Sequence, residues 1–394
     1  MFLGDIYNSR RFSLYESFPF NFYKDKFYYF MSRDIQIINL FSVDPISIHQ
    51  IIESEIGSEE KIIKELRIFL EVPEDYKLLL LPNRFAAYYL AFFTVADVGD
   101  EILTPAPIPY FLRQYADVCA LTIKWIETKS AEDFELPLRR EVEDSITPRT
   151  KIFYFSEPNF SGNIIYSKDS LERIIFISRN YQLFLLTDET LSTLFRDKEG
   201  LIFTKNFALN NERIIRINNF LREFFLGDLT AFIFHSTLPS KIELIAHDLF
   251  PVIQPQLSNV DYFLKHSEEL LQGRLQKLEQ NRIVLQSFLD SRPDVVISYP
   301  NTISSVFLKL PVPNADTFVE WLLCEYNWDK RTVFVAPASL FHSKEYEEEG
   351  EVLIDYSYLN PEILEEGLEI LGEALNRYLG LSEKGVVKDD FREG

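Results

Sequence analysis

The chain contains the stretch Lys151-Ile-Phe-Tyr-Phe-Ser-Glu-Pro-Asn-Phe-Ser-Gly162, in which a short apolar run leads directly into a turn. The run is apolar on both faces, which is typical of a strand buried on both sides of a parallel sheet. The Pro, Asn, Ser and Gly that follow it are turn formers. The stretch therefore predicts a buried strand over Lys151–Phe155 and a loop that holds Asn159 at its carboxyl end.

Runs of the same kind occur before and after this stretch and alternate with helical segments. This alternation indicates a mainly parallel sheet with helices on both faces, and thus an α/β domain built as a three-layer sandwich. A helix that begins after Ser58 is expected to pack against the sheet, because its apolar residues fall on one face. The other predicted strands are Lys77–Leu81, Glu101–Thr104, Leu121–Ile126, Leu183–Thr187, Ile214–Asn218 and Ala231–His235.

A second, smaller α+β domain is predicted from the rest of the chain. A long helix is expected from about Ser267 to just before Pro293, and a last helix has Asn360 as its cap. Between them we expect strands at Val295–Tyr299, Ser305–Leu310, Val333–Ala336 and Val352–Tyr358. We assign residues 46–265 to the large domain, residues 1–45 and 266–380 to the small domain with an N-terminal arm, and residues 381–394 to a polar tail.

The charge and the cysteine content exclude several classes of protein. The 394 residues include 40 Lys and Arg against 61 Asp and Glu, a net charge of −21 that opposes binding to nucleic acid or to anionic membranes. Two cysteines and five dispersed histidines show no disulfide or metal-ligand spacing. No apolar run reaches the roughly 18 residues of a membrane span, and no signal-peptide core is present. We expect a cytoplasmic protein that binds no metal.

Further segments carry a resemblance to a known family through their order and spacing. They are Val98-Gly-Asp-Glu-Ile-Leu-Thr-Pro105, Thr147-Pro-Arg-Thr-Lys-Ile-Phe153, Ser156-Glu-Pro-Asn-Phe-Ser-Gly162, Thr187-Asp-Glu-Thr190 and Glu212-Arg-Ile-Ile-Arg-Ile-Asn-Asn-Phe-Leu-Arg-Glu-Phe224. Together they resemble the pyridoxal-phosphate-dependent aminotransferases of fold type I, class I/II. The resemblance runs from about Ile37 to Leu379 and implies a transferase-like fold.

Two positions match the residues that hold the cofactor ring in this family. The resemblance implies that Asn159 hydrogen-bonds the phenolic oxygen of the ring and that Asp188 pairs with the protonated ring nitrogen. The residues alone allow plainer roles. Asn159 is also a typical turn residue, and Asp188 is also a strand-end carboxylate that could cap nearby amides.

Other positions of the family motif are changed. Arg222 stands where the Schiff-base lysine is expected, and a guanidinium with a pKa above about 12 is not a neutral nucleophile. Asn219 and Thr230 stand at the phosphate-binding serine and arginine positions, and Leu353 lies at or beside the substrate-carboxylate arginine. The resemblance therefore implies that catalytic lysine, phosphate arginine and substrate arginine are all absent.

Two more residues complete the candidate cofactor-binding set, which is Asn159, Asp188, Arg84, Tyr110 and Asn219. Arg84 begins the helix that binds phosphate in the family, where it could restore a positive charge. Tyr110 lies one residue from the position of the aromatic that stacks on the ring. We also expect Arg222 to pair with Asp188, directly or through one water, and Phe160, Leu191 and Leu221 to help fill the pocket.

We interpret the chain as an aminotransferase-like protein that has lost imine-based transamination, a pseudoenzyme that acts without a cofactor as a binding or assembly partner. Two alternatives stay open. One is an enzyme of altered chemistry in the same cleft, with non-covalently bound pyridoxamine or pyridoxal phosphate or another ligand. The other is an ordinary aminotransferase in which a lysine elsewhere reaches the cofactor. The resemblance also implies a homodimer, and another protein partner fits the same interpretation.

Overall fold

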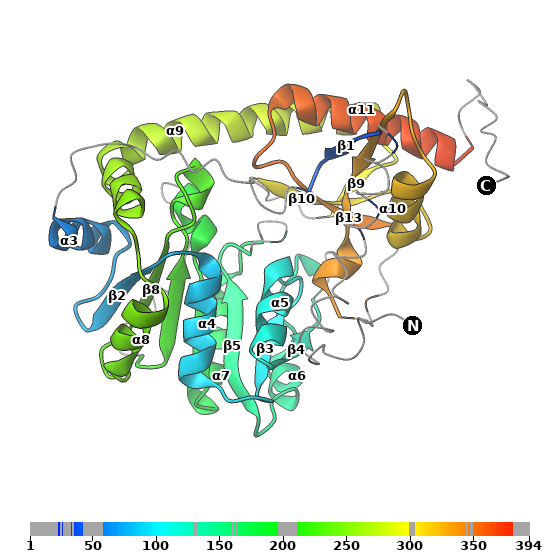
Figure 1. Ribbon diagram of the computed structural model, residues 1–394. Helices are drawn as coiled ribbons and strands as arrows, with labels where there is room; N and C mark the ends of the chain where they lie inside the picture. The colour runs from blue at the N-terminus through cyan, green and yellow to red at the C-terminus, as the bar shows by residue number, and fades with distance from the viewer. Residues whose placement is uncertain are drawn as a thin grey trace, which may run out of the picture.

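The computed structural model describes residues 23, 26, 33, 35–41, 58–128, 132–159, 161, 164–195, 211–298, 304–343, 346 and 350–380. Figure 1 shows a large sheet and its helices in the lower part of the molecule and a smaller group of strands and helices at the upper right. The long helix α9 runs across the top of both groups. The two-lobed architecture expected from the sequence is therefore present.

The large sheet has seven strands in the order β2-β8-β7-β6-β5-β3-β4. All neighbouring pairs are parallel except those of β8, which runs antiparallel to both β2 and β7. The predicted α/β class with a mainly parallel sheet is confirmed. The strands are β2 (Tyr76–Leu81), β3 (Glu101–Pro105), β4 (Thr122–Ile126), β5 (Thr150–Ser156), β6 (Phe184–Asp188), β7 (Ile214–Asn218) and β8 (Thr230–His235).

The helices that connect these strands are short, and side chains cap the first turn of two of them. Asn83 caps the first of them, because its side-chain oxygen accepts a hydrogen bond from the Ala86 amide at 2.9 Å. Ser167 caps α7 in the same way. The helices are α4 (Arg84–Val95), α5 (Tyr110–Val118), α6 (Arg139–Asp144), α7 (Lys168–Asn180) and α8 (Lys241–Leu249), with the short 3-10 helices η2 (Thr190–Phe195) and η4 (Arg222–Phe224).

Two helices differ from the expectation. Helix α3 (Glu59–Phe69) begins after Ser58 as predicted, but it packs against α9 and not primarily against the sheet. Helix α9 (Gln254–Ser291) begins at Gln254, well before the expected Ser267, and bends at His266, where φ is −124° and ψ is 16°. The bend changes the face that α9 buries, which explains why one apolar stripe marked only its second part.

The small domain has a four-stranded antiparallel sheet in the order β12-β13-β10-β9 and a separate parallel pair, β1 with β11. Strand β1 was not expected, because the aromatic-rich N-terminal region shows no period. The predicted strand Val333–Ala336 is divided between β11 and β12. The elements are β1 (Gln36–Asn39), β9 (Val296–Ile297), β10 (Ser305–Lys309), α10 (Ala315–Cys324), β11 (Arg331–Phe334), β12 (Ala336–Pro337), η5 (Ala338–Phe341), β13 (Glu351–Asp355) and α11 (Pro361–Tyr378).

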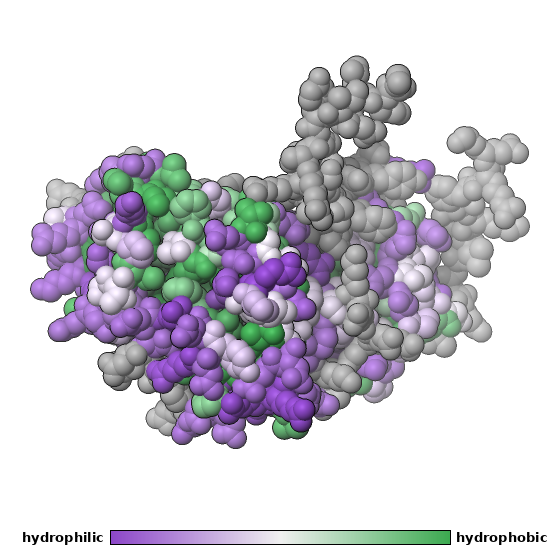
Figure 2. Space-filling view, turned by 90° about the horizontal axis from the view of Figure 1, so that it is seen from below, coloured by the Kyte–Doolittle hydropathy of each residue, from purple (hydrophilic) through white to green (hydrophobic). Residues whose placement is uncertain are grey.

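The surface is mainly polar on the face seen from below, with hydrophobic residues gathered on the left half of that view (Figure 2). Exposed apolar side chains in the large domain include Phe93 on α4 and Leu244 and Leu249 on α8. Within the described ranges, none of the helices combines the length and the apolar character that a membrane span requires. The cytoplasmic location stays a prediction.

Candidate functional site

The candidate residues lie around one edge of the large sheet, at the carboxyl ends of β5, β6 and β7. Asp188 is the last residue of β6, beside Ser156 of β5 and Ile217 of β7. Asn159 follows β5, and η4 with Arg222 follows β7. In parallel sheets this edge is the usual place for ligands, because the strands stop there and loops converge.

The Asp188 carboxylate is buried and hydrogen-bonded by the chain itself. Its Oδ2 accepts a hydrogen bond from the Tyr88 hydroxyl at 2.5 Å, and its Oδ1 accepts one from the Thr190 amide at 2.9 Å. The Tyr88 and Tyr154 hydroxyls are 2.9 Å apart. Burial, together with the negative charge of Asp188, raises the pKa of both tyrosines well above the ordinary value. Both hydroxyls therefore keep their protons at neutral pH.

The side chain of Asn159 is hydrogen-bonded by its own loop and by the loop after β3. Its amide nitrogen donates to the Pro107 carbonyl at 2.8 Å and to the Tyr166 hydroxyl at 3.1 Å. Its side-chain oxygen accepts from the Ser161 amide at 2.9 Å. Because an amide nitrogen has two hydrogens, neither remains for a cofactor oxygen in this arrangement. In this arrangement the side chain holds the turn after β5.

The start of α4, where the family resemblance places a phosphate, contains both signs of charge. Arg84 is buried, with its guanidinium carbon 3.7 Å from the centre of the Phe111 ring. The charges of Arg222 and Asp228 both act on it. The Asn219 side-chain amide donates to the Asp228 carboxylate. A carboxylate at this place disfavours a bound phosphate, since like charges repel strongly where water is excluded.

Arg222 is buried at the end of β7 and points to the small domain. Its Nε donates a hydrogen bond to the Tyr358 hydroxyl at 2.8 Å, and its guanidinium carbon lies 5.6 Å from the centre of the Tyr358 ring. Tyr358 follows β13, so the contact joins the two domains. Burial raises the pKa of Tyr358, which keeps the hydroxyl protonated.

The predicted direct pair of Arg222 with Asp188 is wrong. The partners of the Asp188 carboxylate are Tyr88 and Thr190, whereas Arg222 donates to Tyr358. The sequence reasoning missed Tyr88, although it lies four residues after Arg84 and therefore on the same face of the helix that begins at the site. The hydroxyl of Tyr88 does for Asp188 what we expected Arg222 to do.

The remaining candidates have structural surroundings. Tyr110 is buried at the start of α5, with its ring edge-on to Phe41 at 6.1 Å. Leu191 and Leu221 are buried, and that they fill a vacated pocket stays a prediction. Phe160 lies outside the described residues. Leu353 is in the middle of β13 and pairs with strands on both sides, so it is a core residue of the small-domain sheet.

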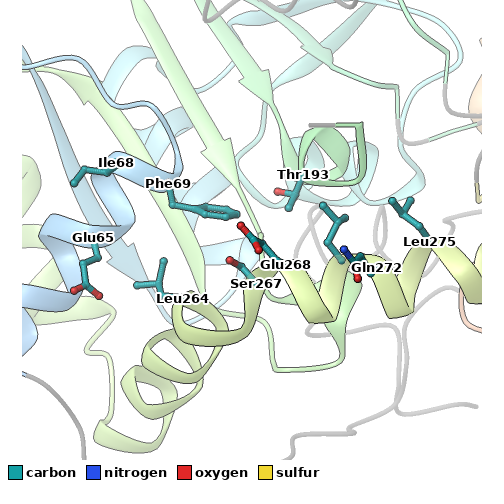
Figure 3. Close-up of a pocket in the computed structure, with 10 residues that line it drawn as sticks. Glu65, Ile68, Phe69, Thr193, Leu264, Ser267, Glu268, Gln272 and Leu275 are labelled. Carbon is teal, nitrogen blue, oxygen red and sulfur yellow. The ribbon is translucent and has the colours of Figure 1, made fainter. Parts of the chain in front are cut away.

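One hollow of about 590 Å³ lies elsewhere, between α3, η2 and α9 next to the bend at His266. Figure 3 shows Phe69 of α3 directed towards α9 across this space, with Glu268 nearby. None of the candidate cofactor-binding residues lines it. In the part of the chain that the structure describes, no group of three or more His, Cys, Asp or Glu side chains is placed to hold a metal ion.

Pyridoxal phosphate is the cofactor that the family resemblance implies, and the described residues do not fit it as an imine. By the family resemblance, Arg222 stands at the position that needs an uncharged amine, and a guanidinium does not supply one. The Asn159 amide has its hydrogens on Pro107 and Tyr166. Thr230, at the phosphate-arginine position, is neutral and donates to the Asp228 carbonyl at 3.2 Å.

In sequence, the chain is similar to known aminotransferases over part of its length. It is 29% identical over 161 residues to a probable aspartate aminotransferase of Methanocaldococcus jannaschii and 25% identical over 169 residues to the aspartate aminotransferase of Thermotoga maritima. These matches cover 39% and 40% of this chain. They span 39% and 44% of the relatives' own length. No protein-family model matches.

The solved structures extend the likeness to nearly the whole chain. The alanine aminotransferase of Pyrococcus furiosus superposes with a TM-score of 0.75 over 94% of this chain and 100% of its own, at 21% identity. The fold is therefore that of the fold type I aminotransferases. In sequence the chain resembles aspartate and other class I aminotransferases.

Proposed function

We propose that this protein has the aminotransferase fold but does not carry out imine-based transamination, and that it acts as a binding or assembly protein. The observation that carries the proposal is the place of Arg222. It stands at the lysine position of the family motif, is buried, and is hydrogen-bonded to Tyr358 of the other domain. A guanidinium in that environment has no neutral amine with which to form an imine.

The rest of the site supports the same proposal. The groups that would hold a cofactor ring, Asn159 and Asp188, are hydrogen-bonded by neighbouring loops and helices. Non-covalent use of pyridoxamine phosphate, the alternative left open above, would require these groups to give up their present partners. Each such exchange costs the hydrogen bonds that it breaks, which lowers the affinity for the ring.

A titration with pyridoxal phosphate tests the proposal. The purified full-length chain is mixed with the cofactor and its absorbance spectrum is recorded. The mixture is then reduced with borohydride, and the mass of the intact protein is measured by mass spectrometry. We expect no imine band and no added mass, whereas the aspartate aminotransferase of Thermotoga maritima serves as the positive control. A reducible band with a matching mass on one lysine would overturn the proposal.

A parallel calorimetric titration with pyridoxamine phosphate distinguishes the proposal from the alternative of an enzyme with a non-covalently bound cofactor. This amine form of the cofactor needs no lysine, so it can bind where an imine cannot form. We expect no saturable heat. Stoichiometric binding without a borohydride-trapped adduct would favour an enzyme of altered chemistry in the same cleft.

The partner that we propose is a second copy of the chain. The family resemblance implies a homodimer, and the exposed apolar side chains Phe93, Leu244 and Leu249 supply surface that a second copy could cover. Size-exclusion chromatography with light scattering at micromolar concentration should give twice the monomer mass. A purely monomeric peak would argue against self-association and favour a different protein partner.

A further inference from the structure

A polar network of buried side chains and the half-buried Tyr358 joins the two domains around Arg222. Glu223, next in η4, accepts a hydrogen bond from the Tyr358 hydroxyl at 2.9 Å through Oε1. Its Oε2 accepts one from Nη2 of Arg274 on α9 at 3.2 Å. Tyr358 thus receives a hydrogen bond from Arg222 and passes one to Glu223. These four side chains come from three separate parts of the chain. Arg222 and Glu223 lie on η4, Arg274 lies on α9, and Tyr358 lies in the loop after β13.

The same network continues into the small domain. Nη1 of Arg274 donates to the Ser357 carbonyl, between β13 and α11. The Phe225 ring meets the Tyr358 ring edge-on at 5.5 Å and lies 5.2 Å from the Arg274 guanidinium carbon. Arg274 and Glu223 are each more than nine-tenths buried, so water does not compete for their contact.

A second set of contacts ties the domains at another place. Glu127, just after β4, is 3.2 Å from Nδ1 of His342, just after η5. The same carboxylate accepts from the Ser343 amide at 3.1 Å. Arg113 of α5 donates to the His342 carbonyl at 2.9 Å. The small domain is therefore held at two separated points along the sheet edge.

We propose that the Arg222–Tyr358–Glu223–Arg274 network is a latch that holds the two domains in one fixed arrangement. A latch needs contacts that cross the boundary and that depend on one another, and this network has both properties. Its Arg274–Glu223 ion pair is also shielded from water, whereas Tyr358 is half-buried. Tyr358 is its central member, because its hydroxyl is both acceptor and donor. Arg222, at the lysine position of the family motif, then has a mechanical role: it holds the large domain against the small domain.

This inference concerns the same site as the proposed function, but it is tested without any cofactor, so the two can fail separately. Amide hydrogen exchange of the full-length chain is compared for the wild type, Tyr358→Phe and Glu223→Gln. Tyr358→Phe removes a single oxygen and keeps the ring packing. The matched control is Tyr76→Phe, which removes a buried hydrogen bond to the Asn211 carbonyl, 2.6 Å long, within the large domain.

We expect Tyr358→Phe to speed exchange about tenfold in peptides from both sides of the latch, residues 220–226 and 352–360. The variant loses the hydroxyl's part-buried hydrogen bonds to charged groups, which eases local opening by about that factor. Glu223→Gln should affect the same peptides, and Tyr76→Phe should leave them unchanged. The latch is overturned if both variants leave residues 352–360 at the wild-type rate, or if Tyr76→Phe speeds exchange there equally.

Discussion

The two halves of the candidate site differ in what the sequence retains and what the structure leaves available. On the ring side, Asn159 and Asp188 keep the residue types of the aminotransferases, yet Tyr166 and Tyr88 already bind them. On the side where the resemblance places the imine lysine and the phosphate, it implies that the residue types differ, and Arg222 binds the small domain. Both halves therefore serve the chain itself, although only one of them looks altered in the sequence.

This difference shows that the residue type at a site position indicates function less well than the group to which that residue is hydrogen-bonded. A carboxylate at the end of a strand is compatible with a cofactor, with a tyrosine hydroxyl or with a cation. Which of these it meets depends on neighbouring elements that the motif does not contain. The predictions below probe each half with a variant and a control.

The largest effect is expected on the imine and phosphate side, around Arg222. Glu223→Ala leaves the buried Arg274 guanidinium without its carboxylate, which should lower the free energy of unfolding by about 3–5 kcal/mol. Urea denaturation measures the loss. The control is Glu279→Ala, which breaks an exposed pair with Arg282 on the same helix and should cost less than about 1 kcal/mol. Equal losses in the two variants would mean that the Glu223–Arg274 pair contributes no more to the free energy of unfolding than an exposed ion pair does.

A pH-dependent effect is expected from Asp355, at the end of β13 beside the same network. Burial raises the pKa of its carboxyl to about 6 from the ordinary 3.8. The neutral form is thus favoured in the folded state, so its contribution to stability is complete below about pH 4 and is lost as the pH rises through 6. The loss amounts to roughly 3 kcal/mol.

Asp355→Asn should remove this pH dependence while keeping the acceptor for the Ser357 amide, whose hydrogen bond is 2.9 Å long. The variant should be more stable than the wild type at pH 7 and nearly equal to it at pH 4. Urea denaturation across this range gives the difference between the two proteins. A difference that is the same at both pH values would show that the Asp355 carboxyl titrates normally.

A smaller effect is expected on the ring side, around Asp188. Tyr88→Phe removes the hydroxyl that donates to Asp188 and should lower the free energy of unfolding by about 2 kcal/mol, the range for a hydrogen bond to a buried carboxylate. Tyr326→Phe is the control, because its hydroxyl makes only a 3.4 Å contact with the Ile370 carbonyl. If Tyr88→Phe is neutral, Asp188 does not depend on this hydroxyl.

The smallest effect is expected at Asn159. Asn159→Ala removes the side-chain contacts that hold the turn after β5, which should cost about 1–2 kcal/mol. Asn180→Ala, at the exposed end of α7, should stay within about 0.5 kcal/mol in thermal or urea unfolding. An Asn159→Ala variant as stable as the wild type would return this residue to a ligand-binding role.

The sequence predicted the sheet well, because buried parallel strands such as Ile214–Asn218 read as short apolar runs. It also predicted that Asn159 lies in the loop after a buried strand and that Asp188 ends the next strand, because turn formers and a carboxylate follow the apolar runs. It missed Tyr88 and the direction of Arg222, because both depend on how α4 and the small domain pack against that edge. It also missed the start of α9, where a bend at His266 divides two different buried faces.

The most direct test of the account is whether a lysine alone can restore the imine. The Arg222→Lys variant is mixed with pyridoxal phosphate and reduced with borohydride. The mass of the intact protein is then measured by mass spectrometry, and peptide mapping locates any adduct at position 222. The account predicts no stoichiometric adduct, because Asn159 and Asp188 remain bound by the chain and Thr230 offers no charge to the phosphate. A full equivalent of reduced cofactor on position 222 would contradict it, since it would show that only the lysine was missing.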